Sequence, residues 1–209
     1  MYKRQRVFNI KTKDKETSLI ENFYYPKYGP GQMWEEMALK IKKMGGKILT
    51  EHEVLKIHKK NNKIENVSCL VKGKVKVFEG DYFISSMPIK DLISEMNNVE
   101  KNIKKIALNL PYRDFITVGL ILNKINLKNN TQIKTYNNLI PDCWIYVQGK
   151  EEKLGRIQVF NNWSPYLIDD INKVSLGLEY FCQENDSFWN KNEEELRDFA
   201  VKELLNMQI

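Results

Sequence analysis

The segment 23–46 contains the first residues whose types and spacing could bind a ligand. Gly29, Pro30 and Gly31 form a turn in which two positions lack a Cβ atom, so another backbone or a flat ligand can approach closely. Pro30 suits the first turn of a helix. The free N–H groups at a helix start suit anionic or carbonyl oxygens. The sequence therefore predicts a ligand-facing helix start here, with a plain turn as the alternative.

A second group of polar and aromatic side chains lies between residues 156 and 166. Arg156 interrupts an otherwise apolar strand expected over 156–160, and its guanidinium can bind a carboxylate or phosphate through two parallel hydrogen bonds. The segment 161–166, NNWSPY, is dense in hydrogen-bonding and aromatic groups. Two simpler interpretations stay open: Arg156 could pair with Glu179 or Glu151, and the two asparagines could only form a turn.

No catalytic constellation is visible in the sequence: we find no Ser-His-Asp set, metal-ligand cluster or phosphate-binding loop. His52 and His58 fall on a hairpin rich in Lys and Glu, where surface exposure is expected. Cys69, Cys143 and Cys182 are odd in number and far apart, which favours reduced thiols in a cytoplasmic protein and argues against structural zinc. We therefore assign no catalytic residue and no metal.

The composition is that of a globular protein, with 209 residues of which 42% are hydrophobic and 11% aromatic. The net charge of +6 comes from scattered lysines, so we expect no nucleic-acid partner. No apolar run reaches membrane-spanning length, and the opening residues show no signal-peptide pattern. A small-molecule substrate is the expected partner, and the oligomeric state is left open.

Several elements must position these residues. A helix with one apolar stripe is expected from Met33 to Met44, ended by glycines at 45 and 46, and its Trp34 and methionines are expected to pack in a core. Strands are expected at 47–49, 54–57, 64–71 and 75–78. The run at 82–84, YFI, is typical of a strand buried on both faces. Two further helices are expected, at 89–96 after Pro88 and at 99–110.

The second half of the chain reads as an antiparallel sheet with a terminal helix. Strands are expected at 115–125, 144–147, 156–160 and 175–181, with a loop at 128–138. Asn192 and Glu195 form a capping box that opens the last helix. Its expected inward residues are Leu196, Phe199, Ala200, Leu204 and Leu205.

The first 19 residues show no useful periodicity and are expected to be disordered or artefactual. Residues 2–5, YKRQ, after a GTG start would be encoded by the end of a transposon adapter used in sequencing libraries. We therefore expect an internal fragment of a longer protein, in which residues 1–5 carry no biology.

A family resemblance rests on the order of these elements, including Gly80-Asp81 and the segment 84–88, ISSMP. From about Asn22 onward the chain resembles the flavin-dependent amine oxidases and protoporphyrinogen oxidases. Three segments resemble the UDP-galactopyranose-mutase-like branch more closely, namely 25–35, 110–114 and 155–166. The resemblance implies an α+β fold, with a partial FAD/NAD(P)-binding layer at 20–108 and an antiparallel-sheet substrate domain with flanking helices at 109–209.

The resemblance also implies FAD as the cofactor of the full-length parent. Members of the family begin with a strand and a G-x-G-x-x-G turn and end with a glycine-containing segment that closes on the flavin. This chain contains neither segment. We therefore expect it to bind FAD weakly or not at all on its own and to be inactive alone; copurification of near one equivalent of flavin would refute this.

Site residues follow from the resemblance position by position. Cofactor contacts are implied for Val54 near the adenine, for Ser86 and Pro88 near the nucleotide, and for Gly29 and Gly31 near the isoalloxazine or substrate. Their alternatives are a strand-core valine and ordinary turns. Substrate contacts are implied for Tyr28, Trp34, Tyr112, Arg113, Arg156, Asn161, Asn162, Trp163, Tyr166 and Tyr180. Aromatic faces can stack on sugars and bases, and Arg can bind anions.

Three functions are carried forward. The first is a fragment of an FAD-dependent oxidoreductase, which an apolar tunnel would favour. The second is a flavin-dependent mutase acting on a nucleotide sugar, which an arginine pair poised for a diphosphate would favour. The third is a non-catalytic ligand- or sugar-binding module with a closed core. A truncated enzyme would instead leave an open sheet edge beside Ile84 and apolar surface around it.

Overall fold

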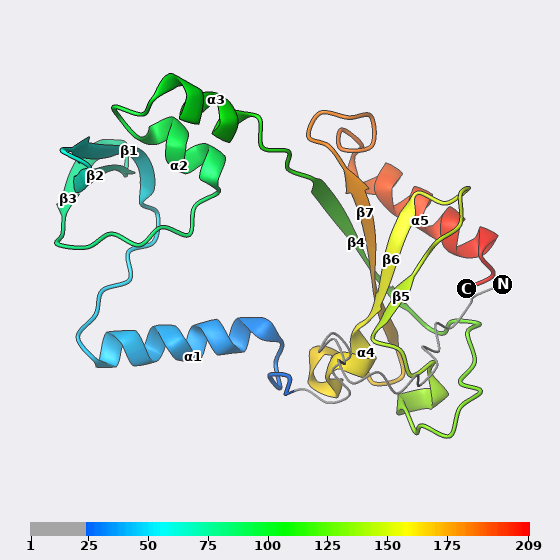
Figure 1. Ribbon diagram of the computed structural model, residues 1–209. Coiled ribbons are helices and arrows are strands. Elements are labelled where there is room, and N and C mark those ends of the chain that lie inside the picture. The colour runs from blue at the N-terminus through cyan, green and yellow to red at the C-terminus, as the bar shows by residue number, and fades with distance from the viewer. Residues whose placement is uncertain (1–23) are drawn as a thin grey trace, which may run out of the picture.

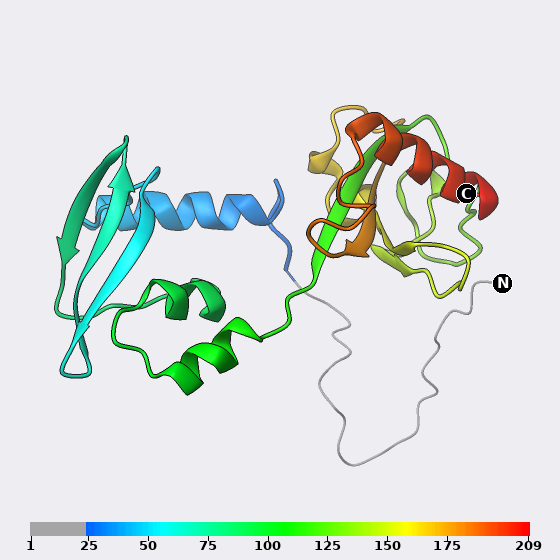
Figure 2. The same cartoon turned by 90° about the horizontal axis from the view of Figure 1, so that it is seen from above.

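The computed structural model describes residues 24–209, so the expectations for residues 1–19 lie outside the described residues (Figure 1). The described chain forms two lobes. The first lobe holds α1, β1–β3, α2 and α3, and the second holds β4–β7 and α5 (Figures 1 and 2). Residues 109–113 lead from α3 into β4. The predicted α+β fold class is confirmed by this mixture of helices and antiparallel sheets.

The first helix, α1 (Pro30–Lys43), begins and ends where the sequence predicts. Gly29 precedes it with a φ of 86°, and Gly45 follows it with a φ of 87°. The expectation that its apolar stripe packs in a core is wrong: α1 buries no residue, and Trp34 is 61% exposed. The physical reason is that no other described element packs along this helix, which lies apart from the other elements in Figure 1.

A three-stranded antiparallel sheet follows, in the order β1 (Glu53–Lys60), β2 (Lys63–Val71) and β3 (Lys74–Glu79). Asn61 and Asn62 close the first hairpin with φ values of 49° and 61°. Such positive φ values at both central residues match the right-handed twist of the strands. The strand expected at residues 47–49 is wrong, because these residues pair with no strand and remain irregular.

The segment after β3 differs most from the sequence prediction. Residues 82–84 form no strand, and Ile84 is 100% exposed, so the expected strand buried on both faces is wrong. The reason is that no described strand lies beside this segment to take its backbone hydrogen bonds. Helices α2 (Ile89–Glu95) and α3 (Lys101–Leu108) then form as predicted. Asn97 ties them to β1, since its Oδ1 accepts a 2.5 Å hydrogen bond from the Lys59 N–H.

The second lobe is a four-stranded antiparallel sheet in the order β4-β7-β6-β5. Its strands are β4 (Asp114–Leu122), β5 (Trp144–Tyr146), β6 (Leu154–Val159) and β7 (Val174–Cys182). Helix α5 (Glu193–Asn206) opens with the predicted capping box of Asn192 and Glu195. Its Ala200 and Leu204 complete the core, whereas Leu205 is 68% exposed, contrary to the prediction.

Short helical turns shape the loops of this lobe, namely a 3-10 turn at Tyr136–Asn138, α4 (Phe160–Trp163) and a 3-10 turn at Pro165–Leu167. Side chains alternate along each strand, so β7 sends Leu176, Leu178 and Tyr180 into the core with α5. Glu179 therefore points to the opposite side of the sheet. Among the described helices, none is both long and apolar enough to cross a membrane.

Candidate functional site

Two stretches far apart in the sequence meet beside the second sheet. The Ser164 hydroxyl donates a 2.7 Å hydrogen bond to the Lys27 carbonyl, across a separation of 137 residues. Gly29 is buried at this contact, and a Cβ atom added to it would lie 3.1 Å from Leu167 Cδ2. The Tyr25 and Trp163 rings pack with their centroids 5.0 Å apart. The junction therefore fixes the start of α1 against the segment 163–167.

Two tyrosines and a lysine form the outer part of this junction. The Tyr28 and Tyr166 rings meet edge to face, with centroids 6.0 Å apart. The Lys27 ammonium lies 4.0 Å from the centroid of Tyr166 and 5.0 Å from that of Tyr28. Such cation–π contacts hold a lysine over aromatic faces even at exposed sites. Tyr28 and Tyr166, which the family resemblance singled out, are thus brought together at the protein surface.

The aromatic series continues from the junction onto the sheet. Trp163 packs edge to face on Trp144, with ring centroids 4.8 Å apart. The guanidinium of Arg156 then lies 5.1 Å from the Trp144 ring and 5.9 Å from the Tyr146 ring. The sheet face away from α5, which we call the open face, carries Trp144, Tyr146, Arg156, Gln158 and Glu179. Contacts therefore run without a break from Tyr25 to Arg156.

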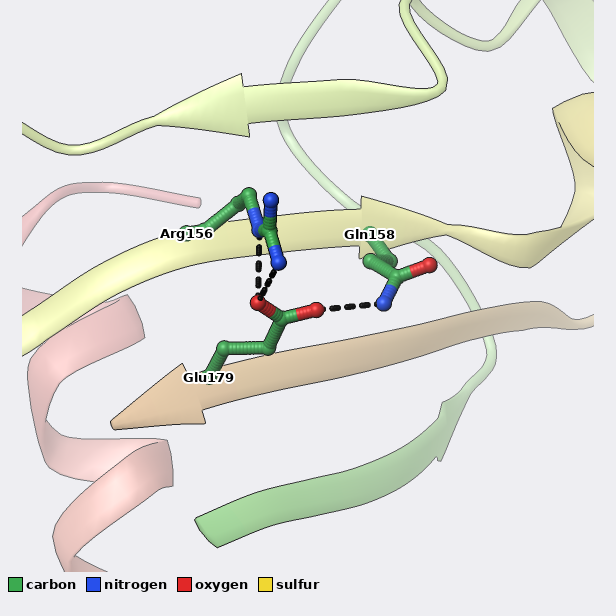
Figure 3. A network of polar contacts seen from close by, with 3 residues as sticks. All are labelled: Arg156, Gln158 and Glu179. Atoms are coloured by element: carbon green, nitrogen blue, oxygen red, sulfur yellow. Dashed lines mark hydrogen bonds and ion pairs between the residues drawn. The ribbon is translucent and has the colours of Figure 1, made fainter. Parts of the chain in front are cut away.

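A buried carboxylate holds Arg156 in place on the open face. The Arg156 Nε and Nη2 atoms lie 2.6 and 2.5 Å from Oε2 of Glu179, and Gln158 Nε2 donates to the other carboxylate oxygen (Figure 3). Glu179 is only 1% exposed. Burial lowers the pKa of the Arg156 guanidinium, but the hydrogen bonds and charges of Glu179 and Tyr146 together outweigh this and the pKa rises. Of the two partners considered from the sequence, Glu179 is the one observed.

Two glycines shape the open face by leaving room for aromatic rings. A Cβ atom at Gly155 would lie 2.8 Å from the ring of Phe181. A Cβ atom at Gly177 would lie 2.9 Å from the ring of Phe160. Both distances are shorter than real contacts, so any side chain at these positions would displace the rings. The glycines therefore let aromatic rings lie directly on the strands around the ion pair.

Asn161 and Asn162 support the loop from within. Asn161 is 2% exposed; its Nδ2 donates to the Lys173 carbonyl at 2.8 Å and its Oδ1 accepts from the Ser175 N–H at 2.9 Å. Asn162 Nδ2 donates to the carbonyls of Ile140 and Asp142 at 2.6 and 3.0 Å. Both side chains are thus engaged in backbone contacts of the loop, in agreement with the alternative that the sequence left open.

Tyr180 lies on the side of the sheet opposite to Arg156. Its side chain is 0% exposed and packs against the rings of Phe188 and Phe199, with centroids 4.9 and 5.8 Å away. Burial, and then the charge of Glu203, raise its pKa. Strand alternation explains the placement, because residues 179 and 180 must point to opposite faces. The substrate contact expected for Tyr180 is therefore not carried into the proposal below.

Tyr112 and Arg113 lie where the chain enters the second sheet. The Tyr112 hydroxyl accepts a 3.4 Å hydrogen bond from the Lys90 N–H, which links it to α2. The Arg113 guanidinium lies 5.1 Å from the Phe181 ring. Tyr112 lines an open polar groove of about 510 Å³ together with Pro88, Asp91 and Glu184. The structure therefore groups Tyr112 with one predicted cofactor residue, Pro88.

The other predicted cofactor residues lie on the first lobe. Val54 is half-buried on β1, an edge strand, and Ser86 is exposed before α2. A Cβ atom added to Gly31 would meet nothing within 4 Å, so its backbone is open to a flat group. Trp34 on α1 is 61% exposed. Cofactor contact at Val54, Ser86 and Gly31, and substrate contact at Trp34, stay predictions.

Sequence reasoning missed several residues of the site, notably Trp144, Tyr146, Gln158, Tyr25 and Lys27, and named Glu179 only as a partner. One signal could have found the first three. Residues 144, 146, 156, 158 and 179 share one face once the strands pair in the observed register. No comparable signal existed for Tyr25 and Lys27, since their contacts depend on chain separations above 130 residues.

Comparisons with known proteins support the fold. No protein-family model and no curated protein matches the chain. A crystal structure of reduced UDP-galactopyranose mutase matches 85% of this chain and 35% of its own, with a TM-score of 0.65 and 18% identity. A Pyrococcus furiosus protein matches 86% of this chain and 40% of its own, with a TM-score of 0.59 and 15% identity.

A third solved structure, a candidate protoporphyrinogen oxidase from Exiguobacterium sp., matches 84% of this chain and 34% of its own, with a TM-score of 0.58 and 12% identity. The chain spans 34–40% of the length of these three proteins. At such low identities the likeness shows the fold alone. The likeness in fold to UDP-galactopyranose mutase and to a protoporphyrinogen oxidase, predicted from the sequence motifs, is confirmed.

Proposed function

We propose that this chain forms part of an FAD-dependent oxidoreductase similar to the amine oxidases and protoporphyrinogen oxidases. The open face and the junction at Tyr25–Gly29 would form its substrate side. One observation carries the proposal: the junction joins the start of α1 to an aromatic series that ends at Arg156. A helix start and a fixed guanidinium thereby border one continuous aromatic surface.

The residues present fit FAD. Gly31 offers a backbone with no side chain above it, and Gly29 holds a φ of 86° that few other residues adopt. Val54 on an edge strand would meet the adenine, with Ser86 and Pro88 beside the nucleotide. When bound, FAD supplies the redox chemistry, whereas protein groups bind and orient the substrate. Tyr28, Trp163, Tyr166 and Arg156 are the groups proposed for that orientation.

Exposed apolar surface on the first lobe supports a larger enzyme. Met33, Trp34 and Met37 on α1 are each at least 45% exposed, and Ile84 is fully exposed. Met33, Trp34 and Met37 lie within five successive residues of α1, and clustered exposed apolar side chains often mark an interface. We propose that a nucleotide-binding strand-helix unit of the complete enzyme packs on α1 and pairs with residues 82–84. A stand-alone binding module would instead cover these residues itself.

The experiment begins with the genomic sequence around this reading frame, read for an in-frame strand and a G-x-G-x-x-G turn. The complete protein is then expressed and its flavin content measured, followed by bleaching of the flavin absorbance by amines or by a reduced tetrapyrrole. We expect Arg156→Met to abolish bleaching and leave the flavin content unchanged. Arg197→Met, which removes an exposed arginine paired with Asp198 on α5, is the matched control and should change neither. Complete protein without flavin would refute the proposal.

A further inference from the structure

We infer that Glu179 is a specificity-determining residue: it makes the open face electrically neutral and thereby excludes phosphorylated substrates. This inference rests on the proposed function only in taking the open face as the substrate side. The relevant contacts are few. Glu179 Oε2 contacts both Nε and Nη2 of Arg156, and its other carboxylate oxygen accepts a hydrogen bond from Nε2 of Gln158. The positive charge of Arg156 is thus opposed at contact distance.

The two rings in contact with Arg156 carry no charge. Trp144 and Tyr146 flank the guanidinium with neutral rings. Two further cations lie over other aromatic rings of the second lobe, Arg113 over Phe181 and Lys27 over Tyr166. Neither of them forms a salt bridge with a carboxylate among the described residues. The centre of the open face therefore holds one positive and one negative charge.

A carboxylate in this position is not explained by stability. Replacing a buried ion pair by apolar residues of similar volume is often neutral or stabilising, because two charges need not be desolvated. Glu179 is 1% exposed, so its desolvation is nearly complete. What the carboxylate does achieve is chemical. It fixes the plane of the guanidinium between two rings and removes the net charge that an anionic ligand would seek.

The class of ligand that suits the open face follows from the opposed charges of Arg156 and Glu179. Recognition of a diphosphate needs free guanidinium or ammonium groups whose donors point at the anion. Arg156 has committed Nε and Nη2 to Glu179, and its side chain is only 25% exposed. A dianion brought to this face would meet a buried carboxylate close behind the guanidinium. A neutral ligand with a ring face would instead contact the Trp144 ring and the guanidinium plane without such repulsion.

The test measures binding of inorganic pyrophosphate to the full chain by calorimetry, without flavin. Glu179→Gln keeps the shape and leaves Arg156 with its charge unopposed, so we expect pyrophosphate to bind about tenfold tighter than to the wild type. Gln158→Lys keeps a donor to Glu179 and adds one positive charge, and the same gain is expected. Asp198→Asn, which frees the exposed Arg197 from its carboxylate, is the matched control and should change affinity by less than about twofold.

Two results would overturn the inference. One is a wild type that binds pyrophosphate as tightly as Glu179→Gln does. The other is a gain in Glu179→Gln no larger than in Asp198→Asn. If Glu179→Gln does not fold, as judged by circular dichroism, Gln158→Lys decides the question by the same comparison. Failure of the proposed function would appear separately, as complete enzyme without flavin, because the pyrophosphate series needs none.

Discussion

Removing one partner of the Arg156–Glu179 pair should cost far more stability than removing both. In Arg156→Met, the Glu179 carboxylate stays buried at 1% exposure and keeps only the donor from Gln158. Breaking a buried ion pair costs about 3–5 kcal/mol because an uncompensated charge remains. The Arg156 side chain is 25% exposed and water can partly replace it, so the lower end, about 3 kcal/mol, is expected.

The double variant Arg156→Met/Glu179→Leu removes the charge together with its partner. Its free energy of unfolding should lie within about 1 kcal/mol of the wild type, since apolar residues of similar volume replace a buried pair at little cost. Urea unfolding of the full chain, followed by circular dichroism, measures all three proteins. A single variant that loses less than about 1 kcal/mol would refute the reasoning, because the carboxylate would then not depend on Arg156.

Three further predictions concern the glycine before α1, the cap of α5 and the pKa of Asp186. Gly29→Ala should lower the free energy of unfolding by about 1–3 kcal/mol, because φ is 86° and the new Cβ would lie 3.1 Å from Leu167; Gly31→Ala, with open space, should not. Asn192→Ala should cost about 1 kcal/mol by removing the α5 cap, measured by urea unfolding. Hydrogen bonds from the backbone N–H groups of Trp189, Gln183 and Phe188 lower the pKa of Asp186 below its ordinary 3.8. The ionised Asp186 therefore stabilises the fold above pH 3.8, and this stabilisation is lost as the pH falls through the pKa of the folded state. The difference in free energy of unfolding between the wild type and Asp186→Asn should shrink over that pH range.

Local patterns were sufficient to predict the second lobe. Strands at 115–125, 144–147, 156–160 and 175–181 were close to β4, β5, β6 and β7, because period-two alternation reports burial on one side of a sheet. The capping box at Asn192 was found for a similar reason, since its two hydrogen bonds join residues only three apart. Leu205 was misplaced because helical periodicity fixes a stripe but not its width.

Burial in the first lobe could not be predicted in the same way. The apolar stripe of α1 and the run at 82–84 satisfy the usual patterns for buried elements, yet both are exposed. A periodicity indicates that a face is suited to burial, but it does not supply the partner that covers it. In physical terms, the error at Trp34 is that no described element covers a correctly predicted helix, whereas at Ile84 the predicted strand itself does not form.

In the candidate site, too, residues identifiable from the local sequence were predicted, whereas contacts between distant segments were not. Arg156 was chosen from the sequence because it lies on an otherwise apolar strand, and its pairing with Glu179 or Glu151 was the alternative considered. The junction of Tyr25 with Trp163 was beyond sequence reasoning, because nothing local encodes a contact between such distant segments. Tyr180 was assigned to the substrate side because the strand register that sends it toward α5 was not known.

The most direct measurement of the central claim is the flavin content of two preparations, the chain alone and the complete protein read from the genomic sequence. We predict that the chain alone carries essentially no flavin, whereas the complete protein carries close to one equivalent, with α1 and residues 82–84 protected from hydrogen exchange. A chain that holds one equivalent by itself, or a complete protein that holds none, would contradict the account.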